Sequence, residues 1–311
     1  MDQIKNFGTI FISLILEGFP FLILGALVSS IIQLKVSEDT IGRLRFKSRF
    51  LSHLVMAVAG IFFPICECAI IPIVRRLVKK GMPIGMAITF MTAVPIVNPV
   101  VFMSTYYGFL GYPHMAFLRF ILGIICSMII GFLAGELTGK NPLKEEIHHH
   151  HHTHEHCCHH HEHSYHHDCV DHHEEGIIKR IVGHVSEEFY EIGRFFIIGA
   201  LLSSIFQSFI PREAVLSIAE GRVSSIITMM LIAFLLSICS ETDAFIGRTF
   251  FNQFTGSSVL AFLIFGPMID IKNTIMLISN FKLNFVIKLV FVITSICFLA
   301  AVTLSVLPYG L

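Results

Sequence analysis

The sequence predicts an all-α protein that crosses a membrane several times. Of its 311 residues, 54% are hydrophobic and only 14% are charged, and the mean hydropathy is +0.75. A soluble domain would carry about 25% charged residues. Lysine plus arginine equals aspartate plus glutamate at 22 each, so the basic excess of a nucleic-acid-binding protein is missing. The composition argues against an ordinary cytosolic enzyme and against a nucleic-acid partner.

Eight apolar stretches are long enough, or nearly so, to cross a hydrocarbon layer of roughly 30 Å. All should be helical, because open strands leave backbone groups unpaired in lipid. In chain order they are 7–32, 51–74, 83–110, 114–137, 195–210, 223–246, 257–278 and 285–307. The first stretch lacks a small-residue cleavage pattern soon after it, so we expect it to be retained rather than removed as a signal peptide.

A histidine-rich segment separates the first four stretches from the last four. Residues 141–176 are polar and hold few aliphatic side chains, so they cannot bury enough apolar surface to fold and should form a disordered linker. The expected organisation is therefore a first membrane repeat at 1–140, the linker at 141–176 and a second membrane repeat at 177–311.

The two halves resemble each other. The segment GALVSSIIQ at 25–33 recurs as GALLSSIFQ at 199–207, and the same offset pairs Glu17 with Glu191 and Glu67 with Glu241. The matches include glycine, glutamine and glutamate in order, which chance similarity between aliphatic segments does not explain. Two homologous repeats of about four hydrophobic segments are typical of secondary transporters.

The distribution of lysine and arginine leaves two topologies open. If all eight stretches span, the flanking basic residues divide ten to eight, and neither side is favoured. If 51–74 and 223–246 are re-entrant instead, fourteen lie on one side and four on the other, as the positive-inside rule favours. The second arrangement makes the repeats inverted and puts the linker in the cytoplasm. The stretch 51–74 is nevertheless long enough to span.

The triplet Cys66-Glu67-Cys68 lies between Pro64 and Pro72 within an apolar stretch. Each proline removes a backbone donor, so we expect an unwound segment in which both thiols can face one ligand; on a regular helix they would be roughly 200° apart. Thiolates prefer soft ions, and a carboxylate at membrane depth usually faces an ion path. The alternative is that the cysteines only pack and that Glu67 is a capped or interfacial group.

Two further segments carry polar residues inside apolar stretches. The second-half counterpart of the triplet reads SETD at 240–243, which would bring a second acid to the repeat interface for proton coupling, or simply cap a helix. Pro95 is followed three residues later by Asn98, and Pro267 by Asp270. Each pair predicts either a break in the helix that carries a polar group or a kink without a ligand. Lys272 could pair with Asp270 or reach the membrane interface. The candidate residues of the transport path are Cys66, Glu67, Cys68, Pro95, Asn98, Ser240, Glu241, Thr242, Asp243 and Asp270.

The linker is a candidate metal-binding segment, because neutral imidazole is a common ligand for Zn, Cu and Ni and a flexible run lets several rings converge on one ion. An inert solvated spacer is the alternative. No cofactor is expected to be required. The candidate ligands are His148, His149, His150, His151, His152, His154, His156, Cys157, Cys158, His159, His160, His161, His163, His166, His167, Cys169, His172 and His173.

The run CECAIIPIVRRLVKKG at 66–81, followed by AVPIVNPVV at 93–101, resembles the YraQ/ArsP-type bacterial permease family, and SETDAF at 240–245 resembles its second signature. The resemblance implies a polytopic inner-membrane permease, and some members of the family export trivalent organoarsenicals by secondary transport. It also implies that Cys66 and Cys68 are thiol ligands. The histidine-rich insertion departs from the plain arsenical exporters and suits a zinc- or copper-handling branch better.

The leading hypothesis is therefore a permease, not an enzyme, that exports a thiophilic metal or metalloid, either a trivalent organoarsenical or a Zn/Cu-type ion. No Gly-x-x-x-x-Gly-Lys-Ser/Thr loop occurs, so a gradient or a partner must drive it. The expected partners are the lipid bilayer, the substrate, and a second copy or a small accessory membrane protein. The alternatives are a divalent-metal uptake permease and an intramembrane thiol oxidoreductase using Cys66 and Cys68.

Overall fold

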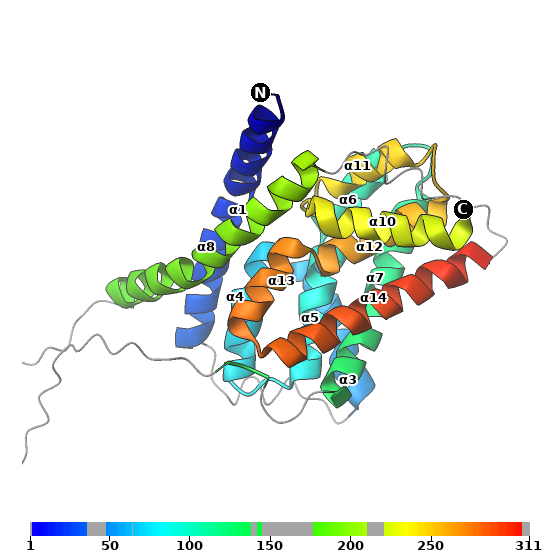
Figure 1. Cartoon of the computed structure of the whole chain (residues 1–311). Helices are drawn as coiled ribbons and strands as arrows, with labels where there is room; N and C mark the ends of the chain where they lie inside the picture. Colours follow the sequence, from blue (N-terminus) through cyan, green and yellow to red (C-terminus); the bar gives the residue numbers. More distant parts are fainter. Residues whose placement is uncertain are drawn as a thin grey trace, which may run out of the picture.

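The computed structural model describes residues 2–35, 48–63, 65–137, 142–144, 177–209 and 221–306, and within these ranges the protein is helical (Figure 1). In chain order the elements are α1 (Asp2–Lys35), α3 (Arg49–Ala59), the 3₁₀ helix η1 (Gly60–Phe62), α4 (Glu67–Lys79), α5 (Ile84–Val97), α6 (Pro99–Gly108), α7 (His114–Leu137), α8 (Ile177–Phe209), α10 (Arg222–Leu236), α11 (Asp243–Phe250), α12 (Gly256–Met268), α13 (Ile271–Asn280) and α14 (Leu283–Val306).

Among the described residues, five helical segments are long and apolar enough to cross a membrane, and α5 with α6, bent by 40°, makes a sixth if the pair is one span. The five are Ile4–Gln33, His114–Leu137, Val185–Ser208, Gly256–Asn280 and Leu283–Val306. This agrees with a multi-pass membrane protein. It differs from the eight stretches read from the sequence, because 51–74 and 223–246 do not form continuous helices.

The break in 51–74 lies on the N-terminal side of the cysteine triplet. The helix α3 gives way to η1, the backbone at Cys66 is extended (φ −77°, ψ 170°), and α4 begins at Glu67. Pro72 lies inside α4, so it does not unwind the chain as expected from the sequence; it removes only the amide that would bond the Cys68 carbonyl. Pro64 lies outside the described residues.

The break in 223–246 follows α10. Ser237 ends this helix in the left-handed region (φ 47°), a conformation that non-glycine residues seldom adopt. Residues 238–242 are not helical, and α11 begins at Asp243. Both interrupted stretches thus consist of two short helices joined by irregular chain.

The ends of several helices lie at the same end of the molecule, which is the lower end in Figure 1. Contacts between residues far apart in sequence establish this: Arg49 pairs with Glu136 (2.6 Å), Lys80 Nζ donates to the Gln33 carbonyl (2.7 Å), and Leu143 bridges to Phe281. The start of α3 and the end of α4 therefore lie at the same end, together with the ends of α1, α7 and α13. In the described structure α3 and α4 enter and leave on one face.

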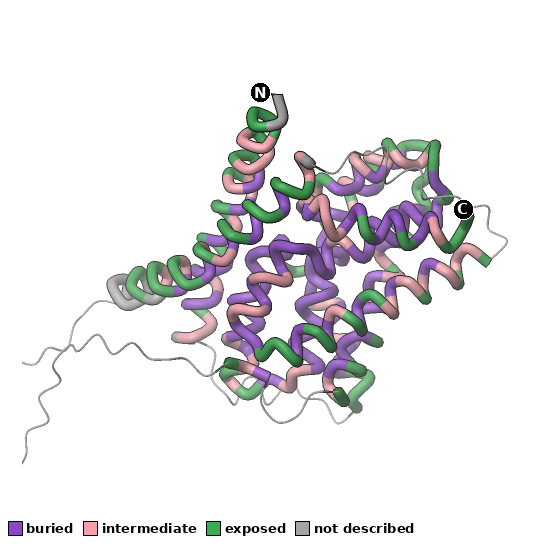
Figure 2. Tube along the Cα trace, viewed as in Figure 1, coloured by how far each residue is buried: buried purple, intermediate pink, exposed green. Residues whose placement is uncertain are grey.

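The core is centred on α5 and α12, which are buried along almost their whole length (Figure 2). A helix that is apolar all round and buried all round is a central helix. By contrast, α1, α7, α8 and α14 carry many exposed large hydrophobic side chains. Such faces are suited to contact with lipid rather than with water.

Helices α5 and α7 pack closely through glycines, and this contact gives a first testable prediction. A Cβ at Gly131 would lie 2.6 Å from the Gly85 carbonyl oxygen and would also overlap the Thr89 hydroxyl. Backbone atoms cannot move aside cheaply, so we expect Gly131→Ala to lower the free energy of unfolding by about 1–3 kcal/mol. Thermal unfolding in detergent measures the change.

The matched control is Gly8→Ala, because a Cβ at Gly8 meets no atom within 4 Å. Gly8 lies within α1, where alanine is favoured over glycine by roughly 0.5–1 kcal/mol. Equal unfolding temperatures for Gly131→Ala and Gly8→Ala would contradict the close packing of α5 on α7.

Candidate functional site

Glu67 is the buried acid at the centre of the candidate site. It opens α4, is 2% exposed, and accepts a long hydrogen bond of 3.4 Å from the Ser240 hydroxyl through Oε2. Its other oxygen, Oε1, has no hydrogen-bond partner among the described residues. A buried acceptor without a partner is costly, so this carboxylate is poised for a proton, a water molecule or a ligand.

A small cavity of about 10 Å³ touches Glu67, which is room for about one water molecule. It is lined by Glu67, Ile70, Ile71, Met91, Pro267, Met268, Asn273 and Leu277. These residues come from α4 and α5 in the first half of the chain and from α12 and α13 in the second half. Glu67 therefore lies at the junction of the two halves.

Three free thiols surround this acid. Cys66, Cys68 and Cys239 are each no more than 1% exposed. Cys68 interacts with Cys66, and Cys239 lies within electrostatic range of both Cys68 and Glu67. Cys239 is not among the residues predicted from the sequence, where only 240–243 is the counterpart of the triplet. In the described ranges no three His, Cys, Asp or Glu side chains are arranged to hold a metal ion.

The chain breaks again at Asn98 and at Asp270, and both residues cap the helix that follows. Asn98 Oδ1 accepts a bond of 2.8 Å from the Val100 amide, and Asp270 Oδ1 accepts one of 2.6 Å from the Asn273 amide. The predicted breaks with a polar group are therefore present, although Pro95 and Pro267 themselves lie inside α5 and α12 and the chain leaves the helix only after them. Each break is marked by its capping residue, Asn98 or Asp270, whose side chain accepts a hydrogen bond from a backbone amide in the first turn of the next helix.

Lys272 places a positive charge in the same region. It is 2% exposed, and its Nζ lies 3.9 Å from Asp270 Oδ2. That separation is too long for a hydrogen bond but short for two charges away from water. Its electrostatic neighbours also include Cys68, Cys239 and Glu67. Of the two arrangements open from the sequence, Lys272 adopts the one in which it pairs with Asp270 at depth.

Asp243 forms the tightest ion pair among the described residues of the core. Arg119 donates to both carboxylate oxygens, at 2.8 and 2.6 Å, and also to the Thr105 hydroxyl at 2.8 Å. Arg119 and Asp243 are 1% and 2% exposed. The pair joins α7 of the first half to α11 of the second. Sequence reasoning missed Arg119, although a lone arginine inside an apolar stretch is a recognisable signal.

The segment 240–242 faces in two directions. Ser240 turns inward to Glu67, whereas Thr242 is exposed and donates to Glu17 Oε1 on α1 at 3.3 Å. Glu241 is half-buried and lies within electrostatic range of Glu67 and of Glu17. Three acids therefore form a series from the partly exposed Glu17 to the buried Glu67.

A second polar cluster joins α1, α4 and α8. Arg76 Nε lies 3.4 Å from Glu188 Oε1, which also accepts a bond of 2.9 Å from Ser29, and Arg75 pairs with Glu191 at 2.8 Å. The histidines and cysteines expected to bind metal between 148 and 173 lie outside the described residues.

Long apolar helices packed around a buried polar site define a multi-pass membrane protein rather than a soluble one. The comparison with known families is specific: the chain belongs to the ArsP_1 family of predicted permeases, which it matches over residues 3–306. This agrees with the resemblance read from 66–81, 93–101 and 240–245.

Curated relatives support the same family. The chain is 40% identical to the UPF0718 protein YcgR of Bacillus subtilis over 286 residues, 91% of each chain. It is 34% identical to a putative two-component membrane permease complex subunit of Streptococcus mutans over 281 residues, 90% of this chain and 89% of the relative. A weaker match, 25% over 122 residues, covers 39% of this chain and 34% of the UPF0718 protein YraQ of Escherichia coli. No solved structure matches the chain.

Proposed function

We propose that this protein is a secondary-transport permease that exports a thiophilic metal or metalloid across the bacterial inner membrane. One observation carries the proposal: Glu67, with one unpartnered oxygen, lies among Cys66, Cys68 and Cys239 where the two halves of the chain meet. Soft thiolates select thiophilic species, and a carboxylate at depth accepts the protons released when thiols bind metal.

In this proposal Lys272 balances charge in the empty site, and the nearby acids carry protons. In the empty site the single charge of Lys272 neutralises Asp270 and lies close enough to Glu67 to reduce the cost of a second negative charge in a low-dielectric interior. A cationic substrate takes over that neutralisation when it binds. The series Glu67, Glu241 and Glu17 carries the exchanged protons towards the surface, since each acid is within electrostatic range of the next.

The proposal includes inverted repeats at 1–140 and 177–311. Supporting a repeat, the described part of each half contains one long α-helix (α1 or α8), four α-helices of 8 to 15 residues (α3 to α6 or α10 to α13) and a final α-helix of 24 residues (α7 or α14). The interrupted stretch 51–74 enters and leaves on one face, which favours the fourteen-to-four charge distribution. In that orientation the linker is cytoplasmic, where its histidines would capture Zn, Cu or Ni.

A partner subunit is part of the proposal. The Streptococcus mutans relative is named as one subunit of a two-component membrane permease complex. We therefore expect this chain to act with a small accessory membrane protein or with a second copy of itself.

Transport into everted membrane vesicles tests the function. With a proton gradient imposed and zinc, copper and trivalent methylarsenic offered in parallel, we expect one species to accumulate. Cys66→Ser/Cys68→Ser should reduce accumulation to background, because a hydroxyl is a poor ligand for thiophilic species. The double variant Cys126→Ser/Cys297→Ser changes as many buried thiols in α7 and α14 and should retain transport.

Accumulation of none of the three species by folded, membrane-inserted protein would contradict export of a thiophilic substrate. Accumulation only in right-side-out vesicles would favour the alternative, uptake of a divalent ion, with the same cysteine control. Equal loss in both double variants would show that the thiols matter for folding rather than for substrate.

A further inference from the structure

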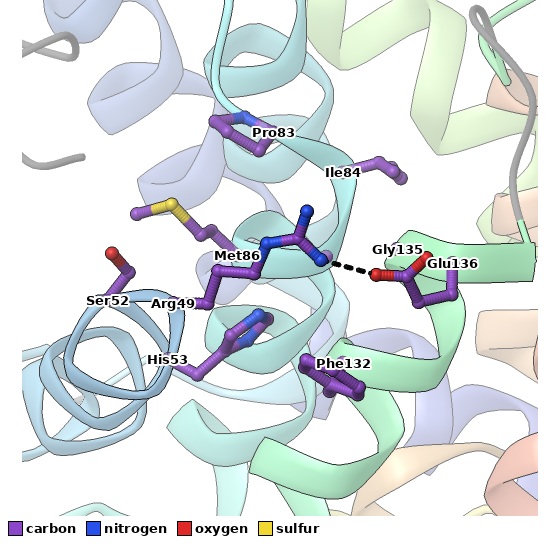
Figure 3. A pocket seen from close by; sticks show the side chains of 10 residues that line it. Arg49, Ser52, His53, Pro83, Ile84, Met86, Phe132, Gly135 and Glu136 are labelled. Atoms are coloured by element: carbon purple, nitrogen blue, oxygen red, sulfur yellow. Dashed lines mark hydrogen bonds and ion pairs between the residues drawn. The ribbon is translucent and has the colours of Figure 1, made fainter. Parts of the chain in front are cut away.

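A separate pocket lies at the end of the molecule where α3 starts and α7 ends. Its volume is about 300 Å³, and its lining comes from α3, α5 and α7: Arg49, Ser52, His53, Pro83, Ile84, Gly85, Met86, Phe132, Gly135 and Glu136. In Figure 3 the Arg49–Glu136 ion pair runs across the middle of the view, with Pro83 and Ile84 above it and His53 and Phe132 below it. None of these residues belongs to the site around Glu67.

The polar part of the pocket offers one positive and one negative group. Arg49 and Glu136 are 2.6 Å apart, with side chains 75% and 58% exposed, so both remain accessible to a ligand. His53 is 9% exposed, and its Nδ1 is bonded to the Thr89 hydroxyl at 2.7 Å. The pocket is therefore complementary to a ligand that carries both a cation and an anion.

An apolar hollow of about 500 Å³ continues from this pocket. The two share His53 and Phe132, and the hollow is lined by Phe50, His53, Leu54, Ile124, Ile125, Met128, Ile129, Phe132 and Leu133. Ile125 and Ile129 are 46% and 42% exposed, so the hollow opens on the outer face of α7 and not towards the core.

The dimensions match one leaflet of a bilayer. From Glu136 to Ile124 the helix rises about 18 Å at 1.5 Å per residue. Half of a hydrocarbon layer of roughly 30 Å is about 15 Å. Glu136 is the penultimate residue of the span His114–Leu137, which places the ion pair at the level of the head groups and the apolar hollow at the level of the acyl chains.

We propose that this pocket and hollow bind one membrane phospholipid with a zwitterionic, primary-amine head group. The phosphate pairs with Arg49, the ammonium pairs with Glu136, and an acyl chain lies along Ile125, Ile129 and Leu133. An anionic head group without an amine would place its charge beside Glu136 with nothing to neutralise that carboxylate. The charge pattern thus selects the zwitterion, independently of what the protein transports.

Thermal unfolding of the delipidated protein in detergent tests the site. We expect phosphatidylethanolamine to raise the unfolding temperature of the wild type more than phosphatidylglycerol does. Arg49→Gln and Glu136→Gln should each remove this preference. Arg222→Gln is the control, because Arg222 is likewise an exposed arginine at the start of a helix, α10, in the other half of the chain. This variant should keep the wild-type response.

A variant of the hollow tests the acyl chain separately. Ile129→Trp fills the hollow without touching the ion pair, and it should abolish retention of phosphatidylethanolamine through purification, measured by mass spectrometry of co-purified lipid. Glycerophosphoethanolamine and inorganic phosphate, which have no acyl chains, should not stabilise the protein. Equal stabilisation by these soluble compounds, or by phosphatidylglycerol, would overturn the proposal.

Discussion

Replacing Asp243 with alanine is expected to destabilise the protein more than any other single change considered so far. Arg119 would keep its charge at 1% exposure without the two bonds of 2.8 and 2.6 Å that it now makes. Leaving one member of a buried ion pair uncompensated costs about 3–5 kcal/mol. The chain has no tryptophan, so reaction of its buried cysteines with a fluorescent thiol reagent during heating is a suitable measure of unfolding.

The control is an exposed ion pair with the same shortest N···O distance, 2.6 Å. Glu136 pairs with Arg49 at 2.6 Å, but both side chains face outward, and such pairs contribute about 0–1 kcal/mol. In detergent Glu136→Ala should therefore unfold close to the wild type. If Asp243→Ala unfolds at the same temperature as Glu136→Ala, the buried pair does not hold the two halves together.

A compensating double variant identifies the cause of the loss. Arg119→Met/Asp243→Leu removes both charges and keeps apolar volume, a change that is often neutral or stabilising for buried pairs. Stability should return in this variant. Failure of the double variant to recover would mean that the further bond from Arg119 to the Thr105 hydroxyl, and not the charge, is what the region requires.

The long helices follow directly from the sequence. The stretches 114–137 and 285–307 are predominantly apolar and contain no proline, and they become α7 and α14 with bounds that differ by at most two residues. Lipid offers no partners for backbone groups, so a continuous apolar segment has one satisfactory conformation. In such segments, hydrophobic length alone determines the structure.

The positions of the breaks were harder to predict, because the capping residue marks the end of each helix more closely than the proline before it does. Pro95 lies inside α5, and the helix ends three residues later at Asn98. A proline within a helix removes one hydrogen bond. Asn98, by contrast, has a side chain that can cap a helix, and the Pro99 that follows it disfavours helical backbone at Asn98 itself. The Asn-Pro pair was therefore the stronger signal, and it was present in the sequence.

Which residues meet in the site depends on contacts between distant parts of the chain, and a short sequence motif does not reveal such contacts. Ser240 donates to Glu67 across 173 positions, and Arg119 meets Asp243 across 124. The repeat indicated that 240–243 and Glu67 occupy related places. It gave no indication that Asp243 would be held by an arginine from another helix, because Arg119 has no counterpart in the matched segments.

Replacing Lys272 with methionine is expected to separate binding from transport. The variant removes the cation that lies 3.9 Å from Asp270 while keeping a long apolar stem. A zinc ion would then meet the negative groups without a competitor, so we expect purified Lys272→Met to bind zinc about tenfold more tightly, equivalent to 1.4 kcal/mol. Binding of methylarsenite, which carries no charge, should not change.

Transport by Lys272→Met should fall by about tenfold or more, although binding is tighter. Without a cation to replace the substrate, release leaves Asp270 and Glu67 uncompensated in the interior, and the empty carrier becomes the high-energy state of the cycle. Zinc binding by isothermal titration and zinc flux in vesicles measure the two quantities on the same protein.

The double variant Lys272→Met/Asp270→Asn distinguishes this role from a structural one. It removes both charges, so it should fold as stably as the wild type yet remain slow in transport, because the exchange of cations is still lost. If the double variant recovers transport together with stability, Lys272 serves only to neutralise Asp270. If Lys272→Met binds zinc no more tightly than the wild type, the lysine does not compete with the substrate, and the proposed exchange is wrong.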